Sequence, residues 1–161
     1  MKIGFILNGE DVEINSEADV RLVDILRNNF GLLGAKNGCL FGKCGFCAVL
    51  FNNMVIHSCL MPAFKLSGSE IITIEGFSQT DEYHDIVTGF KLANLEDCGY
   101  CRTGKILSAG ALLERNKRPT KQEILRAFSG IKCRCTDPET LVRGIEEAIE
   151  VRQRRLYGRS V

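Results

Sequence analysis

The chain has 161 residues, of which 45% are hydrophobic and 25% are charged, and its formal net charge is +1. These proportions are ordinary for a globular protein, and the balanced charge gives no support to binding of nucleic acid or of a membrane surface. No apolar run is long enough to cross a membrane, and polar residues interrupt the first residues too early for a signal peptide. We therefore expect a cytoplasmic protein.

The first half of the chain predicts a mixed α+β domain. Two strands are predicted over Lys2–Asn8 and Asp11–Asn15, joined by a tight turn at Asn8-Gly9. A helix is predicted from about Val20 to Asn29, with Asp19 as its N-cap. A second hairpin, a short helical turn and a final strand are expected after it: Cys47–Phe51 with Met54–Cys59, turning at Asn52-Asn53; a turn within Leu60–Lys65; and Glu70–Ile74.

The second half predicts helices only. The polar stretch Ser78–Asp81 is expected to be a linker, and the helices after it are expected at His84–Asn94, Arg102–Asn116, Thr120 to about Phe128, and Thr136 to about Val151 or beyond. Capping boxes are predicted at the start of the last two, with Thr120 paired to Glu123 and Thr136 to Glu139. The basic tail Arg152–Val161 is expected to be loose. The chain is thus expected to divide into residues 1–76 and 77–161.

Eight cysteines are the main chemical feature of the sequence, and they fall into two sets of four. Without a secretory signal, metal ligation is favoured over disulfide bonds, because a reducing cytosol opens structural disulfides. The first set is Cys39, Cys44, Cys47 and Cys59, and the second set is Cys98, Cys101, Cys133 and Cys135. No Ser/His/Asp set, phosphate loop or pair of acids accompanies them, so we predict no catalytic residue on this chain.

The first set has the spacing C-x4-C-x2-C followed by a distant fourth cysteine, which is typical of plant-type [2Fe-2S] sites. Nearby glycines, Gly38, Gly42 and Gly45, allow backbone N–H groups to turn toward the sulfurs. The alternative is a zinc site, because Cys44 and Cys47 form a CxxC pair. Zinc sites usually contain two such pairs, whereas the remaining cysteines here are spaced differently, and so the cluster is favoured.

The second set lies in two loops of the helical half. Cys98 and Cys101 immediately precede the helix predicted at Arg102, and Cys133 and Cys135 lie between two later helices. An antiparallel helical hairpin brings such loops to one end of a bundle, where the positive end of the helix dipole faces the thiolates. A four-cysteine zinc site is again the alternative. Against it, the later pair is C-x-C, which is uncommon in structural zinc sites.

In this order, C-x4-C-G-x-C-x11-C and then C-G-x-C-x31-C-R-C, the two patterns resemble the iron–sulfur subunit of the molybdenum hydroxylases. That family includes xanthine dehydrogenase, aldehyde oxidoreductase and carbon monoxide dehydrogenase. The resemblance implies a plant-type ferredoxin-like (β-grasp) domain followed by an all-α four-helix-bundle domain, each with one [2Fe-2S] cluster. The ligands that it implies are the same eight cysteines.

By the same resemblance, the chain is the electron-transfer subunit of a multi-subunit oxidoreductase and carries no substrate site. It would relay electrons from a large molybdopterin subunit, where substrate is hydroxylated, to an FAD-binding subunit within a hetero-oligomer. The C-terminal cluster would be nearer molybdenum and the N-terminal cluster nearer FAD. Two alternatives are a zinc-stabilised interaction module without a redox role and a redox protein of the same fold that serves a non-molybdenum partner.

The chain departs from the family pattern on the side that is expected to face the pterin. Asp97 stands where the family usually has glutamine, and the other departures include Lys105, Ile131 and Asp137. An ionised aspartate only accepts hydrogen bonds, so we expect Asp97 to pair with Arg102 or another nearby cation. We interpret the chain as a member of a divergent subfamily whose large partner differs at the cofactor contact.

Other polar residues near the cysteines are given structural roles. His57 lies two residues before Cys59 and is interpreted as a strand residue rather than a ligand, because four cysteines already complete the set. Tyr100 is expected to shield the second set. Three lysines lie next to the cysteine loops and could raise the cluster potentials by their charge, but solvated surface is the favoured interpretation: Lys36, Lys43 and Lys132.

Overall fold

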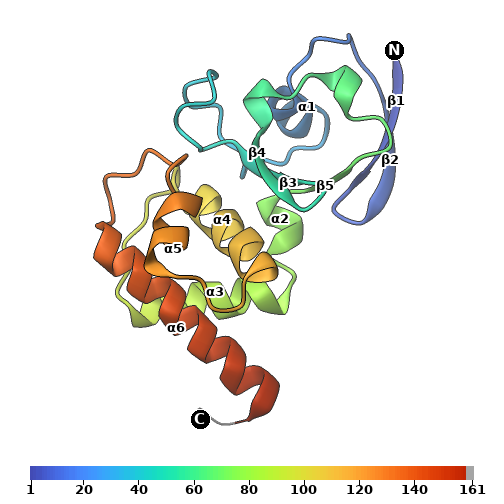
Figure 1. Cartoon of the computed structure of the whole chain (residues 1–161). Helices are drawn as coiled ribbons and strands as arrows, with labels where there is room; N and C mark the ends of the chain where they lie inside the picture. The colour runs from blue at the N-terminus through green and yellow to red at the C-terminus, as the bar shows by residue number, and fades with distance from the viewer. Residues whose placement is uncertain (159–161) are drawn as a thin grey trace.

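The structure is a computed structural model, and it describes residues 1–158. A five-stranded sheet and one helix form the sheet half of the molecule, and the remaining helices form the helical half (Figure 1). The strands are Lys2–Leu7 (β1), Glu10–Asn15 (β2), Ala48–Phe51 (β3), Met54–His57 (β4) and Glu70–Ile72 (β5). The helices are Leu22–Asn29 (α1), Ile74–Phe77 (α2), Asp81–Leu92 (α3), Arg102–Arg115 (α4), Lys121–Ala127 (α5) and Pro138–Tyr157 (α6), with 3-10 turns at Ser58–Leu60 (η1) and Ala63–Lys65 (η2).

The sheet has the strand order β2-β1-β5-β3-β4, in which β1 and β5 run parallel and the other neighbours run antiparallel. Both hairpins turn where the sequence predicts. Asn8 and Gly9 close the first and Asn52 and Asn53 close the second, with φ angles from 48° to 86°. Positive φ at both central residues is the requirement of the type I′ turn, whose twist suits a hairpin.

Helix α1 packs on the sheet but begins later than predicted. Its N-cap is Arg21 rather than Asp19, and this residue makes no side-chain capping bond. The preceding segment is held in an extended form, since the Ala63 N–H donates to the Val20 carbonyl at 2.8 Å. The backbone there is paired with a distant segment, and the helix begins only after that pairing ends. The apolar face of α1 is buried in the core of the sheet half: Leu22, Val23, Ile25 and Leu26.

The last strand is shorter than predicted. Strand β5 ends at Ile72 instead of Ile74, because the side chain of Asn8 takes over the bonding of the next residue. The Asn8 side-chain oxygen accepts the Thr73 N–H at 2.8 Å, and the Asn8 amide donates to the Thr73 hydroxyl at 3.1 Å. The chain then turns directly into α2.

The polar stretch Ser78–Asp81 is not a linker, contrary to the sequence prediction. Thr80 within it caps α3 by accepting the Tyr83 N–H at 3.2 Å. Phe77, at the end of α2, packs into the core of the helical half. The stretch is therefore a tight connection between two helices of the same core.

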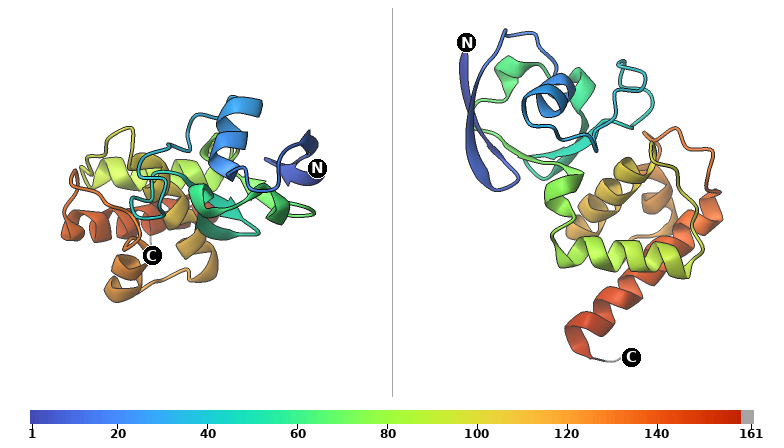
Figure 2. Two further views of the ribbon diagram at one scale, coloured as in Figure 1. Left: turned by 90° about the horizontal axis from the view of Figure 1, so that it is seen from above. Right: turned by 180° about the vertical axis from the view of Figure 1, so that it is seen from behind.

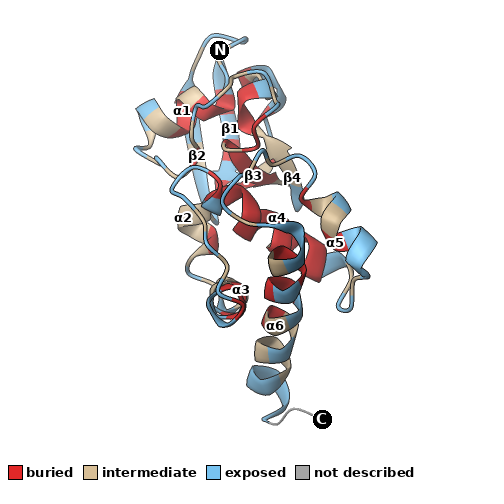
Figure 3. Cartoon of the chain, turned by 90° about the vertical axis from the view of Figure 1, so that its left-hand side faces the viewer, coloured by how far each residue is buried: buried red, intermediate tan, exposed pale blue. Residues whose placement is uncertain are grey.

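Helix α4 is the centre of the helical half and is buried along almost its whole length (Figure 3). The helices α3 and α6 cross in backbone contact, because a Cβ atom placed on Gly89 would lie 2.3 Å from the backbone nitrogen of Ala148. Beside this crossing, the buried carboxylate of Asp85 pairs with Arg155 at 2.7 Å. The crossing fixes α6, and with it the loop that precedes α6.

One of the two predicted capping boxes is confirmed and the other is wrong. The box at Thr120 is present at the start of α5. At the start of α6 the N-cap is Asp137, whose carboxylate accepts the Thr140 N–H at 2.9 Å. Thr136 lies one residue before this N-cap, and its hydroxyl is engaged away from the helix: it accepts from the Lys105 ammonium and donates to the Glu96 carbonyl.

Helix α6 extends to Tyr157, so the prediction of a loose tail from Arg152 onward is wrong for residues 152–157. The last part of that predicted tail, residues 159–161, lies outside the described residues. Within residues 1–158 there is no strand after β5, as predicted. None of the helices in this described range is both long and apolar enough to cross a membrane.

Candidate metal centres

The first set of cysteines lies mainly on the loop between α1 and β3. Gly42 and Gly45 give this loop its path, with φ angles of 69° and 78° that favour glycine. The path turns the backbone N–H groups of Phe41 and Lys43 toward the sulfur of Cys39, at 3.3 Å and 3.2 Å. The Phe41 N–H is the main cause that lowers the pKa of Cys39 to about 6. The loop therefore favours the thiolate, which is the form that binds metals.

The other sulfurs of the first set are buried. Cys47 directly precedes β3 and Cys59 lies in η1, and Ser58 joins them by donating its hydroxyl to the Cys47 carbonyl at 2.7 Å. Burial raises the pKa of Cys47 to about 11, and its thiol adjoins that of Cys59. In the same way, the sulfur of Cys39 adjoins the thiol of Cys44. The first set thus consists of two neighbouring pairs of sulfurs.

The second set gathers at the N-terminal end of α4. The Cys101 sulfur lies 3.5 Å from that of Cys98 and 3.6 Å from that of Cys133. The sulfurs of Cys98, Cys101 and Cys135 all lie within 4.8 Å of one another. The two loops therefore meet at one end of α4, as the helical-hairpin argument predicts. All eight cysteines are free thiols in this structure.

The thiols of the second set differ in their electrostatic surroundings. Burial raises the pKa of Cys101 to about 12. The backbone N–H of Cys101 is the main cause that lowers the pKa of Cys98 to about 7. Burial acts to raise the pKa of Cys133, but hydrogen bonds, first among them that from the Lys105 side chain, lower it to about 7. The pKa of Cys135, by contrast, is raised although this thiol is exposed, mainly by its hydrogen bond with Cys98.

Lys105 is the residue of this site that the sequence analysis missed. Its side chain is only 2% exposed, and its ammonium donates to the Thr136 hydroxyl at 2.6 Å and to the Glu96 carbonyl at 3.5 Å. The sequence could have indicated that Lys105 lies near the second set, because it follows Cys101 by four residues, which places both residues on the same face of α4. From the sequence, Lys105 stands out only as a departure from the family pattern, without a role.

The two cysteine sites are in direct backbone contact. The Lys132 N–H donates to the carbonyl of Cys44 at 2.9 Å, which joins a residue of the first set to the neighbour of Cys133. A Cβ atom placed on Gly45 would lie 2.6 Å from the Gly130 carbonyl oxygen, so the loops approach as closely as glycine allows. Figure 2 shows the loop before β3 reaching the loop before α6. The two halves therefore meet at their cysteine loops.

The expected pairing of Asp97 is confirmed. Its carboxylate lies 3.3 Å from the guanidinium of Arg102, the first residue of α4. The Asp97 side chain is 12% exposed and that of Arg102 is 45% exposed. The charge of Asp97 is therefore balanced within this chain.

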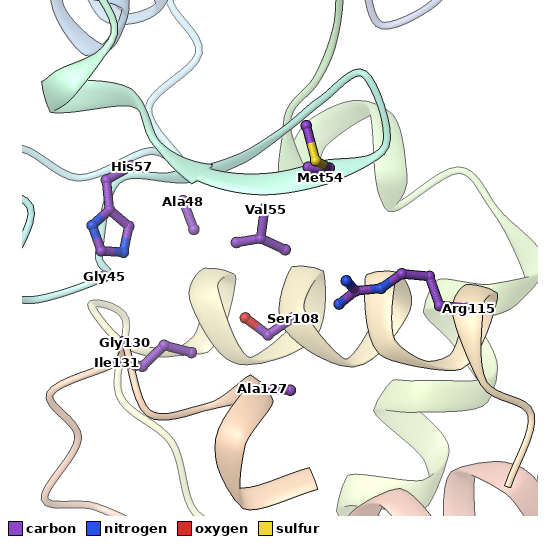
Figure 4. A pocket seen from close by; sticks show the side chains of 10 residues that line it. All are labelled: Gly45, Ala48, Met54, Val55, His57, Ser108, Arg115, Ala127, Gly130 and Ile131. Carbon is purple, nitrogen blue, oxygen red and sulfur yellow. The ribbon is translucent and has the colours of Figure 1, made fainter. Parts of the chain in front are cut away.

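A separate cavity of about 330 Å³ lies between the β3–β4 hairpin and α4. Figure 4 shows Arg115 and Ser108 of α4 on one wall and His57 at one end of it. The residues that line it include no cysteine, and among residues 1–158 His57 belongs to no cluster of three potential metal ligands. His57 is therefore a wall residue of this cavity, in line with its assignment as a strand residue.

The sulfurs of the first set lie in two pairs, Cys39 with Cys44 and Cys47 with Cys59, and this pairing suits a centre of two metal ions. Two neighbouring pairs are the arrangement that a [2Fe-2S] core needs, since each of its two irons takes two of the four cysteines.

Fold and sites together define a protein with two four-cysteine sites, and the comparison with known families identifies them as [2Fe-2S] centres. Residues 5–72 match a family described as "2Fe-2S iron-sulfur cluster binding domain", and residues 73–146 match one described as "[2Fe-2S] binding domain". Each half therefore corresponds to one [2Fe-2S]-binding family.

Relatives align with nearly the whole chain. The nicotinate dehydrogenase small FeS subunit of Eubacterium barkeri is 41% identical over 148 residues, which cover 92% of this chain and 94% of the relative. The nicotine 6-hydroxylase small subunit of Paenarthrobacter nicotinovorans is 36% identical, covering 92% and 89%. A chain in the crystal structure of quinoline 2-oxidoreductase from Pseudomonas putida 86 superposes with a TM-score of 0.85 at 33% identity, covering 98% of this chain and 97% of that one.

The chain belongs to the iron–sulfur subunits of the molybdenum hydroxylase family. It is the iron–sulfur subunit of a multi-subunit oxidoreductase and binds two [2Fe-2S] clusters. The predicted family and cofactors are thereby confirmed.

Proposed function

We propose that this chain carries electrons between a large molybdopterin subunit and an FAD-binding subunit of a cytoplasmic hetero-oligomer. The names of its relatives support the first part, because a small FeS subunit of a dehydrogenase and a small subunit of a hydroxylase have larger partners. An exposed apolar side chain lies near each of the two cysteine sites, which supports a partner subunit at each site. Phe41 is 73% exposed beside the first set, and Tyr100 is 58% exposed within the second.

We assign the cluster ligands to the two sets of cysteines. The N-terminal cluster is held by Cys39, Cys44, Cys47 and Cys59, and the C-terminal cluster by Cys98, Cys101, Cys133 and Cys135. When bound, each cluster supplies a carrier for one electron at a time. The protein contributes thiolate-favouring N–H donors at Cys39, buried thiols at Cys47 and Cys101, and apolar packing that limits access of water.

We also propose the finer description of the fold. Residues 1–76 form a plant-type ferredoxin-like (β-grasp) domain, supported by the mixed sheet and the loop of the first set. Residues 77–161 form a four-helix-bundle domain, supported by the packing of α3, α4, α5 and α6 around one core. The proposed boundary falls within α2, whose last residue, Phe77, packs into the core of the helical half.

The observation that carries the relay function is the backbone contact between the two ligand loops. Through the hydrogen bond from Lys132 to Cys44, a short covalent and hydrogen-bonded path joins a ligand of one cluster to the residue beside a ligand of the other. A chain that served only as a structural module would have no need to bring the two ligand loops together.

This contact is tested by Gly45→Ala in the purified complex. A Cβ atom there meets the Gly130 carbonyl at 2.6 Å, so the loops must separate. We expect electron transfer between the two centres, followed by rapid-freeze EPR, to slow at least several-fold with both clusters retained. Gly68→Ala is the matched control, because Gly68 has a similar φ of 68° but no atom within 4 Å of the added Cβ. Equal rates in the two variants would contradict the proposed path.

A further inference from the structure

Lys105 is a buried cation without a buried anion. Charged side chains are rarely buried completely unless they are paired. The two oxygen partners of the Lys105 ammonium, the Thr136 hydroxyl and the Glu96 carbonyl, are uncharged, and its third neighbour is the sulfur of Cys133, a member of the second set. None of the ion pairs found within residues 1–158 includes Lys105. Among the described residues no carboxylate therefore compensates this positive charge, and the group beside it that can become negative is a sulfur of the second set.

The groups around Lys105 show where the missing negative charge belongs. Its side chain lines a small cavity of about 160 Å³ together with the sulfur-bearing Cys133 and apolar residues that include Phe128 and Leu141. Its backbone N–H donates to the carbonyl of Cys101 at 3.1 Å, so the lysine lies one helical turn from that ligand. Four cysteine thiolates around a [2Fe-2S] core carry net negative charge, which matches the cation.

We infer that the Lys105 ammonium is the built-in counter-charge of the C-terminal cluster and raises its reduction potential. The inference rests on the ligand assignment proposed above. Reduction adds negative charge to the cluster, and a fixed cation nearby stabilises the reduced form more than the oxidised one. Because the lysine is buried, solvent and salt screen its charge much less than that of a surface residue.

Lys132 provides the matched comparison. It directly precedes Cys133 in sequence, but its side chain is exposed, whereas Lys105 is buried. Both are lysines beside the same cluster, and they differ in their contact with water. If burial is what makes the charge effective, neutralising Lys132 will change the reduction potential of the C-terminal cluster much less than neutralising Lys105.

The experiment measures the midpoint potentials of both clusters in the whole complex by EPR-monitored titration with dithionite. We expect Lys105→Gln and Lys105→Met to move the potential of the C-terminal cluster to more negative values and to leave the N-terminal cluster unchanged. Lys105→Arg, which keeps the charge, is expected to remain closest to the wild type. The effect of Lys132→Gln is expected to be small and to disappear at high salt, whereas that of Lys105→Gln persists.

Lys105→Gln separates charge from hydrogen bonding, since the amide can still donate to Thr136 and Glu96. An unchanged C-terminal potential in Lys105→Gln at full iron content would overturn the inference and leave Lys105 a structural role. Failure of the ligand assignment has a different signature, because Cys101→Ser would then retain the C-terminal EPR signal. If Lys105→Met does not fold, the comparison of Lys105→Gln with Lys105→Arg still tests whether the positive charge raises the reduction potential.

Discussion

In the sheet half, the Cys39 sulfur accepts two backbone N–H groups from a loop whose path depends on glycines. In the helical half, the sulfurs meet the N-terminal end of α4 and the buried ammonium of Lys105. The first arrangement stabilises negative charge with partial charges of the main chain, and the second adds a full charge from a side chain. Main-chain donors depend on loop conformation, whereas a side-chain charge can be changed by one substitution. The reduction potential of the second cluster is therefore the one that a single substitution can change most easily.

The largest expected effect is the loss of one cluster without the other, when a ligand of either site is replaced. Cys47→Ser and Cys101→Ser each remove a buried sulfur, and a serine hydroxyl is a poor ligand for iron. Each variant is expected to lose one of the two EPR signals and about half of the iron, with the other centre intact. Iron and sulfide analysis with EPR checks this. Loss of both signals in either variant would show that the two sites do not form independently.

A smaller effect is expected from Gly89→Ala, which tests the packing that supports the second site. The added methyl group would meet the backbone of Ala148 at 2.3 Å, and a backbone atom cannot move aside as a side chain does. Overpacking of this kind costs about 1–3 kcal/mol. Thermal unfolding is the measurement. Gly4→Ala in β1 is the control, because its nearest atom is 3.9 Å away, and it is expected to leave the melting temperature nearly unchanged. A similar loss in both variants would contradict the proposed contact.

The smallest effect concerns the capping box of α5. The Thr120 N–H, which donates to Glu123 at 2.7 Å, is the main cause that lowers the pKa of this carboxyl below its ordinary value of 4.5. Because the folded pKa is depressed, the stabilisation is present above the unfolded pKa and is lost as the pH falls through the folded pKa. We expect the melting temperature of the wild type to exceed that of Glu123→Gln at pH 7, with the difference shrinking below about pH 5. A difference that grows in acid would contradict this assignment.

Local signals in the sequence were reliable where local chemistry decides the structure. The turns at Asn8-Gly9 and Asn52-Asn53 formed as predicted, because these residues accept positive φ at little cost. The cysteine spacings led to the correct family and cofactors for the same reason, since ligand geometry constrains spacing directly. The division at residue 76 and the assignment of individual ligands remain predictions.

The errors occurred where distant segments compete for the same groups. Asp19 lost its capping role because the neighbouring Val20 pairs with Ala63, and Thr136 lost its own because its hydroxyl accepts from Lys105 and donates to Glu96. Neither partner is near in sequence. Lys105 was missed in the same way, because only the assembled core of the helical half shows that this lysine is almost fully buried.

Thr136 also bears on how the second site is assembled. It accepts a hydrogen bond from Lys105 and donates one to Glu96, a residue 40 positions earlier, so it ties the loop of Cys133 and Cys135 to the segment before Cys98. Three sulfurs of the first set, by contrast, lie within the nine residues from Cys39 to Cys47. The helical half must therefore bring distant segments together before its four sulfurs converge, whereas the sheet half presents most of its sulfurs from one local loop.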